Sequence, residues 1–263
     1  MKLLVLFRFV LLAALLGLAS KLWMGERTSQ LYDSQEALLA QRMQTIDELR
    51  LIQSEFDALQ TLVAAYVVSK NSQRLVNYYE LLDTHAGERT YVKPVDNVYW
   101  SRMIAGTVDP VALLPGQGPT LQARLQLPEA LAPAFTANLR SSDNTILRLS
   151  AILREREQII FALTQGLYDP EKQQFVSDAP EREDIAIQML FSEAHLSLNN
   201  AIRAEIQSRI GLVENAYQDA LVEQTQSIQT TASIDLYTGL LITASLLIGL
   251  GILHFFVIRP LRE

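Results

Sequence analysis

The chain has 263 residues, of which 49% are hydrophobic and 19% are charged, and its formal net charge is −7. It contains no cysteine, which excludes disulfides, thiolate metal sites and thiol nucleophiles, and its acidic balance without a basic block argues against nucleic acid as a partner. A mean hydropathy of +0.13 is high for a solvated helical domain of this size, so the excess apolar residues must be concentrated in particular segments.

The first apolar segment covers residues 3–24 and is long enough to cross a hydrocarbon layer of ~30 Å. A cleaved signal peptide is the alternative, because Gly17 and Ala19 imitate a cleavage site. However, Arg8 interrupts the apolar core that a signal peptide needs, and Trp23 is typical of an interfacial anchor. We therefore expect a retained transmembrane helix over residues 3–24.

Long amphipathic helices are predicted on both sides of a central Pro-rich stretch. Apolar residues recur there at alternating spacings of three and four, the pattern of a coiled coil or an antiparallel bundle. The three seams are Leu49, Ile52, Phe56, Leu59, Val63 and Tyr66; then Ile146, Leu149, Leu153, Ile160, Leu163 and Leu167, with Arg156 at one seam position; then Ile202, Ile206, Ile210, Val213, Tyr217 and Ala220.

Residues 71–127 are expected to form a broken element between the first two seams. Pro and Gly cluster between Pro94 and Pro133, which predicts loops and short helices. The tight segment 168–180 joins the middle and last helices, so it must lie at the end of the domain far from the membrane. The middle helix therefore runs outward, and the broken element must return from the distal end toward the membrane. The predicted fold class is all-α, an elongated antiparallel four-helix bundle flanked by two transmembrane helices.

The last helix is predicted to continue into a second span. Nothing between Glu183 and Ile258 compels a helix break, and residues 236–258 contain no Asp, Glu, Lys or Arg. A single rod would then connect the bundle to the membrane.

Basic residues near the spans predict that both termini are cytoplasmic. Lys2 and Arg8 stand at the start of the chain, Arg259 and Arg262 follow the second span, and such residues tend to remain in the cytoplasm. The expected organisation in a bacterial inner membrane is a transmembrane helix at 3–24, a periplasmic helical sensory domain at 25–235, a second transmembrane helix at 236–258 and the start of a linker at 259–263.

The end of the chain resembles a known class of receptors. Arg259-Pro260-Leu261-Arg262-Glu263 directly follows the second span, where Pro suits the opening of a new helix. Together with two spans and a helical exported domain, this is similar to bacterial receptors whose second span feeds a HAMP linker, namely chemoreceptors, sensor histidine kinases and diguanylate cyclases. Tyr78-Tyr79-Glu80, followed by Arg89, Pro94 and Tyr99-Trp100, also resembles the sensory part of some such receptors.

The resemblance implies signal transduction, as in chemotaxis or two-component systems, by the N-terminal sensory portion of a receptor. No catalytic site is expected in this portion, although an output module beyond it could be a histidine kinase or a cyclase. His85, His195 and His254 lie far apart without ligand-like spacing, so no metal and no cofactor are expected.

Candidate ligand contacts lie in the broken element, where aromatic rings crowd beside basic side chains as in small-molecule pockets. They are Tyr78, Tyr79, Arg89, Tyr99, Trp100 and Arg102. Packing of these rings into the core is the competing interpretation.

Arg156 is the remaining candidate, because a charge facing a bundle interior must be paired. A structural ion pair with Glu80, Glu193 or Glu205 is the expectation, and capture of a ligand carboxylate is the alternative.

The expected function is transmembrane reception. A small ligand or a periplasmic protein would bind the exported domain of a homodimer in the lipid bilayer, and a displacement of the last helix would be relayed to the cytoplasm. The alternative is a membrane-anchored coiled-coil scaffold of an envelope complex, which needs neither the aromatic broken element nor the Arg-Pro-Leu segment.

Overall fold

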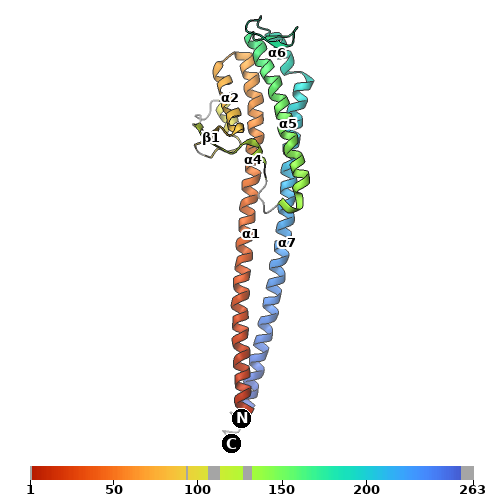
Figure 1. Ribbon diagram of the computed structural model, residues 1–263. Coiled ribbons are helices and arrows are strands. Elements are labelled where there is room, and N and C mark those ends of the chain that lie inside the picture. The colour runs from red at the N-terminus through yellow and green to blue at the C-terminus, as the bar shows by residue number, and fades with distance from the viewer. Residues whose placement is uncertain (1, 93, 106–112, 127–131, 256–263) are drawn as a thin grey trace. The chain divides into compact units, whose positions relative to one another are not determined.

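The computed structural model describes residues 2–92, 94–105, 113–126 and 132–255 (Figure 1). Its helices are α1 (Lys2–Ser69), α2 (Ser72–Ala86), α3 (Tyr99–Ile104), α4 (Leu121–Leu125), α5 (Ala132–Gln165), α6 (Glu183–Leu190) and α7 (Glu193–Leu253), and its strands are β1 (Arg89–Tyr91), β2 (Leu113–Pro115), β3 (Tyr168–Asp169) and β4 (Gln174–Phe175). The predicted all-α class is confirmed. The predicted linker at 259–263 and the end of the predicted second span lie outside the described residues.

The chain divides into two compact units. One comprises residues 1–41 and 217–263, and the other comprises residues 42–216. The second unit contains the short helices and both hairpins.

The core of residues 42–216 follows the predicted seams. Every member of the first seam is buried, and the third seam is buried from Ile202 to Val213. In the second seam the structure corrects two positions. The last member, Leu167, is 38% exposed. In addition, Glu157 is buried where Arg156 was expected, and Arg156 is only half-buried. Positions 156 and 157 both lie one turn from Leu153 and Ile160, so spacing alone did not distinguish them.

The broken element consists of short helices, as predicted, and of a β-hairpin that was not predicted. The Asn71 side chain caps α2 by accepting a hydrogen bond from the backbone N–H of Gln73 at 2.9 Å. β1 and β2 pair antiparallel, with Arg89 opposite Pro115 and Tyr91 opposite Leu113. α2, the hairpin and α4 lie beside α1 (Figure 1).

The connection between α5 and α7 turns sharply. Gly166 ends α5 at φ +69°, and its carbonyl accepts a hydrogen bond of 2.8 Å from the Ala179 N–H. The hairpin β3–β4 and α6 follow. The prediction that nothing interrupts the last helix after residue 183 is wrong, because the chain breaks at Phe191 and restarts at Ser192, whose carbonyl accepts from His195 N–H at 3.0 Å.

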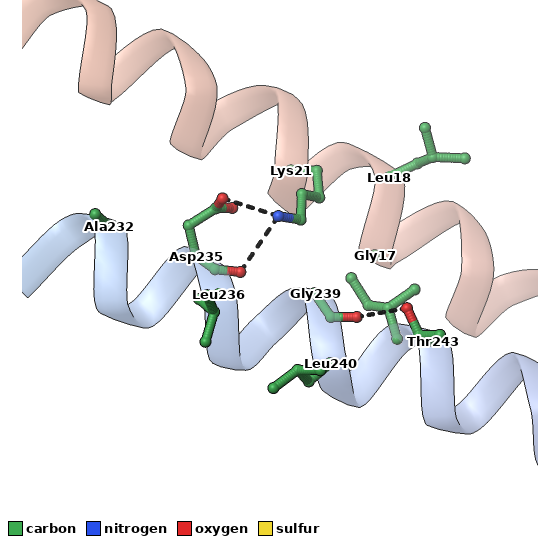
Figure 2. Close-up of a pocket in the computed structure, with 10 residues that line it drawn as sticks. Gly17, Leu18, Lys21, Ala232, Asp235, Leu236, Gly239, Leu240 and Thr243 are labelled. Atoms are coloured by element: carbon green, nitrogen blue, oxygen red, sulfur yellow. Dashed lines mark hydrogen bonds and ion pairs between the residues drawn. The ribbon is translucent and has the colours of Figure 1, made fainter.

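In the unit formed by residues 1–41 and 217–263, α1 and α7 run side by side. Lys21 Nζ lies 2.8 Å from Asp235 Oδ2, and it also donates to the Asp235 carbonyl at 3.3 Å (Figure 2). Gly17 permits a close approach, since a Cβ atom there would lie 2.8 Å from Ile242 Cδ1. Among the described residues, one helix, α7, is long and apolar enough to cross a membrane, with a window of mean hydropathy 1.7.

Candidate functional site

Glu55 of α1 is the centre of a buried polar cluster, which we call the Glu55 cluster. Its other members are His85 of α2, Tyr91 of β1, Trp100 of α3 and Arg124 of α4. Glu55 is completely buried. The cluster therefore draws on each helix and the first strand of the broken element.

Both oxygens of the Glu55 carboxylate accept hydrogen bonds. Oε2 is 2.9 Å from His85 Nε2 and 2.9 Å from Arg124 Nη1, while Oε1 accepts from the Tyr91 hydroxyl at 2.9 Å and from Arg124 Nη2 at 3.1 Å. Trp100 Nε1 extends the chain by donating to the Tyr91 hydroxyl at 2.8 Å. The geometry of Arg124 is the bidentate form that makes guanidinium–carboxylate pairs strong.

The electrostatics of the cluster favour a charged Glu55. Burial alone raises the pKa of this carboxyl group, but the His85 hydrogen bond and the Arg124 charge outweigh burial and lower the pKa to about 2. At neutral pH Glu55 is therefore a carboxylate that can only accept, so His85 donates through Nε2. The cluster fixes the broken element to α1 through a satisfied buried charge.

A second buried carboxylate lies on α5. Glu157 is 2% exposed, and its Oε2 accepts a hydrogen bond of 2.7 Å from the Tyr78 hydroxyl of α2. Phe161 packs against Tyr78 with ring centroids 4.9 Å apart. This pair connects α2 to α5 just as the Glu55 cluster connects α2 to α1.

The sequence-predicted ligand contacts do not converge on one place. Tyr78 packs against Tyr79 and Phe161, whereas Tyr99 packs against Tyr91 and Trp100. Tyr78, Tyr99 and Trp100 are buried, while Tyr79 is 44% exposed.

The predicted basic contacts are engaged locally. Arg89 pairs with Glu80 at 3.2 Å and with Asp83 at 3.2 Å, and Arg102 pairs with Asp96. These side chains stabilise turns within the broken element, and ligand contact by them stays a prediction.

Arg156 does not form the expected ion pair with Glu80, Glu193 or Glu205 in the described part of the chain. Its Nη2 donates to Ser192 Oγ at 3.3 Å, at the start of α7. His195 is buried nearby, and burial, together with the Arg156 charge, lowers its pKa. Arg156 therefore supports the α6–α7 junction.

A groove of about 580 Å³ lies between α1 and α7 in the unit formed by residues 1–41 and 217–263. Figure 2 shows the Lys21–Asp235 pair at one end and Gly17, Gly239 and Thr243 further along. Apart from the Lys21–Asp235 ion pair and Thr243, the groove is lined by apolar side chains and glycines, which is typical of packed helices. Within the described residues, no group of three or more His, Asp or Glu side chains is arranged to hold a metal ion.

The sequence interpretation missed Glu55, Arg124 and Glu157. A signal for Glu55 was present, because it stands three residues after the seam residue Ile52 and four before Leu59, a spacing that places it on the buried face of α1. Arg124 gave no such signal, since its partner lies 69 residues earlier in the chain.

No family model matches the chain, and no curated protein or solved structure shows significant similarity to it.

Proposed function

We propose that this chain is the sensory portion of a two-span receptor of the bacterial inner membrane. Residues 3–24 and 236–258 cross the bilayer, and residues 25–235 form an exported antiparallel four-helix bundle. The bundle receives a small ligand or a periplasmic protein, and the signal is relayed to a HAMP-like linker at 259–263 and an output module beyond it.

The observation that carries the proposal is the continuity of α7. This helix of 61 residues buries Ile202, Ile206 and Val213 in the core, and it also contains the apolar window long enough to cross a membrane. Because a packed helix has discrete alternative positions, a shift of the buried part of α7 is transmitted along the helix to its apolar segment.

The Glu55 cluster supplies the input side of the mechanism. It joins α2, β1 and α4 to α1 through one carboxylate, so a stimulus that moves α2 or α4 must strain or break hydrogen bonds to Glu55. A scaffold would not need a buried charge whose loss is costly, and this favours reception over the scaffold alternative.

Homodimerisation is supported by an exposed apolar stripe on α1. Leu18, Tyr32 and Leu39 are 61%, 56% and 41% exposed and, with Gly25, recur every seven residues. A heptad repeat on a continuous helix suits parallel packing against the same stripe of a second copy.

The test uses a cysteine at the exposed Gly251 near the end of α7, in a chain that has no other cysteine. Disulfide formation between copies in membrane vesicles reports the position of this helix. The substitution Glu55→Gln mimics a stimulus, and it should change the rate of disulfide formation. Asp57→Asn, at an exposed ion pair on the same helix, is the matched control and should leave the rate unchanged.

Replacing Gln226 and Ser227 by Gly-Pro should abolish the effect of Glu55→Gln, because Pro inside a helix costs ~3 kcal/mol or more and breaks the rod. An Ala-Ala replacement at the same positions should preserve it. Equal disulfide rates in Glu55→Gln and in the unaltered domain would contradict the proposal.

A further inference from the structure

Glu157 is a buried carboxylate with incomplete hydrogen bonding. Tyr78 donates to Oε2 at 2.7 Å, but Oε1 is buried without a hydrogen-bond partner among the described residues. Aromatic rings surround the pair: Phe161 lies 4.9 Å from the Tyr78 ring and 5.4 Å from the Tyr66 ring, measured between centroids. An ionised carboxylate is disfavoured in such a site, because burial removes water and little replaces it.

The groups around Glu157 do not neutralise it. Arg154, on the same helix, acts on it only through its charge, and α1 and α2 contribute the phenols of Tyr66, Tyr78 and Tyr79. Glu55 differs from Glu157, because its charge is neutralised by the Arg124 guanidinium in a bidentate pair.

On α7, His195 is buried with no hydrogen-bond partner for either ring nitrogen among the described residues, and burial and the Arg156 charge lower its pKa. Arg209, also of α7, donates to the Leu125 carbonyl. The proton affinity of Glu157 is thus set mainly by burial and by Tyr78.

The physical consequence is a carboxyl group that titrates near neutrality. Burial raises the pKa of Glu157 to about 7, although the Tyr78 hydrogen bond and Arg154 act to lower it. Burial and the adjacent carboxylate raise the pKa of the Tyr78 phenol, so Tyr78 keeps its proton and remains the donor. Of these two groups, only Glu157 gains or loses a proton near neutral pH.

We propose that Glu157 is the proton-binding site through which the domain responds to pH. The inference rests on the proposed function, since an exported domain meets the pH of the surrounding medium. Loss of the proton leaves a charged oxygen without a partner between α2 and α5, and this cost is relieved when the two helices separate enough to admit water.

Because Tyr78 lies on α2, a movement of α2 away from Glu157 also affects other contacts of this helix. α2 carries both Tyr78 and His85, and His85 donates to Glu55 of α1 at 2.9 Å. A displacement of α2 at Glu157 therefore acts on the Glu55 cluster as well. The proton would be the stimulus, and α2 the element that it moves.

The first test is a titration of the whole chain in lipid nanodiscs by infrared difference spectroscopy. The spectrum of the unaltered chain minus that of Glu157→Gln should show a protonated carboxyl band at pH 5.5 that disappears by about pH 8. Tyr78→Phe removes a hydrogen bond that favours the carboxylate, so it should move the midpoint to higher pH. Absence of the band at pH 5.5 would overturn the inference.

The second test measures the α2–α5 distance with spin labels at the exposed positions Val76 and Glu155, each replaced by cysteine. The distance distribution should shift between pH 6 and pH 8 in the otherwise unaltered chain and should remain fixed in Glu157→Gln. An identical response in both proteins would assign the pH effect to another group and overturn the inference. Failure of the α7 disulfide test contradicts the proposed function but does not change the titration, so the two failures are distinguishable.

Discussion

Arg124 of α4 holds Glu55 of α1 with two parallel hydrogen bonds, Nη1 to Oε2 at 2.9 Å and Nη2 to Oε1 at 3.1 Å. The two side chains are 6% and 0% exposed, so the pair is sealed from water. Arg124 also donates through Nε to Glu48, two helical turns earlier than Glu55 on α1. The short helix α4 is thus fixed to α1 by charge, in addition to the burial of its Leu121 and Leu125 side chains.

Removing Arg124 should destabilise the domain strongly. Arg124→Ala leaves Glu55 buried without its cation, and loss of one partner of a buried pair costs about 3–5 kcal/mol. The matched control is Arg203→Ala, because Arg203 also pairs with an α1 carboxylate, Asp57, but both side chains are 45% exposed. That change should cost no more than ~1 kcal/mol. Denaturant unfolding in detergent micelles measures both, and equal losses would contradict a structural role for the buried pair.

Stability should fall in acid because of Glu55. Its pKa is about 2 in the folded chain against an ordinary value of 4.5, so its contribution is complete above pH 4.5 and is lost as the pH falls towards 2. The contribution is about 3 kcal/mol. Glu55→Gln should be less stable at pH 6 and should show a flatter acid limb. Parallel curves for the two proteins between pH 4.5 and 2 would show that Glu55 is not held as a carboxylate.

The regular parts of the fold were predictable from sequence, because long helices repeat their apolar spacing many times. All members of the first seam, from Leu49 to Tyr66, are buried as predicted. The α6–α7 break was missed because one polar cap, Ser192, overrides a pattern that otherwise continues.

The candidate site was less predictable, since its geometry depends on contacts between distant residues. Tyr78 and Trp100 were singled out as ligand contacts, which stays a prediction, and the acceptors of their hydrogen bonds, Glu157 and the Tyr91 hydroxyl, lie in other elements. Sequence spacing does not show which charged residue of a helix turns inward when its partner is 69 residues away, as for Glu55 and Arg124.

The turn after α5 should require glycine at position 166. Its φ of +69° disfavours other residues, and a Cβ atom would lie 2.4 Å from the Ala179 carbonyl oxygen. Gly166→Ala should therefore cost about 2 kcal/mol or more. Gly211 is the matched control, because it lies within α7 with nothing within 4 Å of an added Cβ, and Gly211→Ala should stabilise by about 0.5–1 kcal/mol. Thermal unfolding followed by circular dichroism distinguishes the two, and a neutral Gly166→Ala would contradict the turn geometry.

The pairing of α1 with α7 can be tested by an engineered disulfide. Gln224 Nε2 donates to the Leu31 carbonyl at 3.0 Å and to Ser34 Oγ, so cysteines at positions 34 and 224 should form a disulfide within one chain. The control joins position 34 to the exposed Val222, two residues along the helix, and should remain reduced. Oxidation followed by electrophoresis shows whether the disulfide has formed within one chain. Efficient bonding of the control pair alone would show a different helix register.

The most direct measurement of the central claim is the side of the membrane on which the domain lies. Gln117 is exposed between β2 and α4, and Gln117→Cys introduces the only cysteine of the chain. In intact spheroplasts this cysteine should react with a membrane-impermeant maleimide, whereas Glu263→Cys should react only after lysis. Reaction of Gln117→Cys only after lysis would place the domain in the cytoplasm and contradict reception across the membrane.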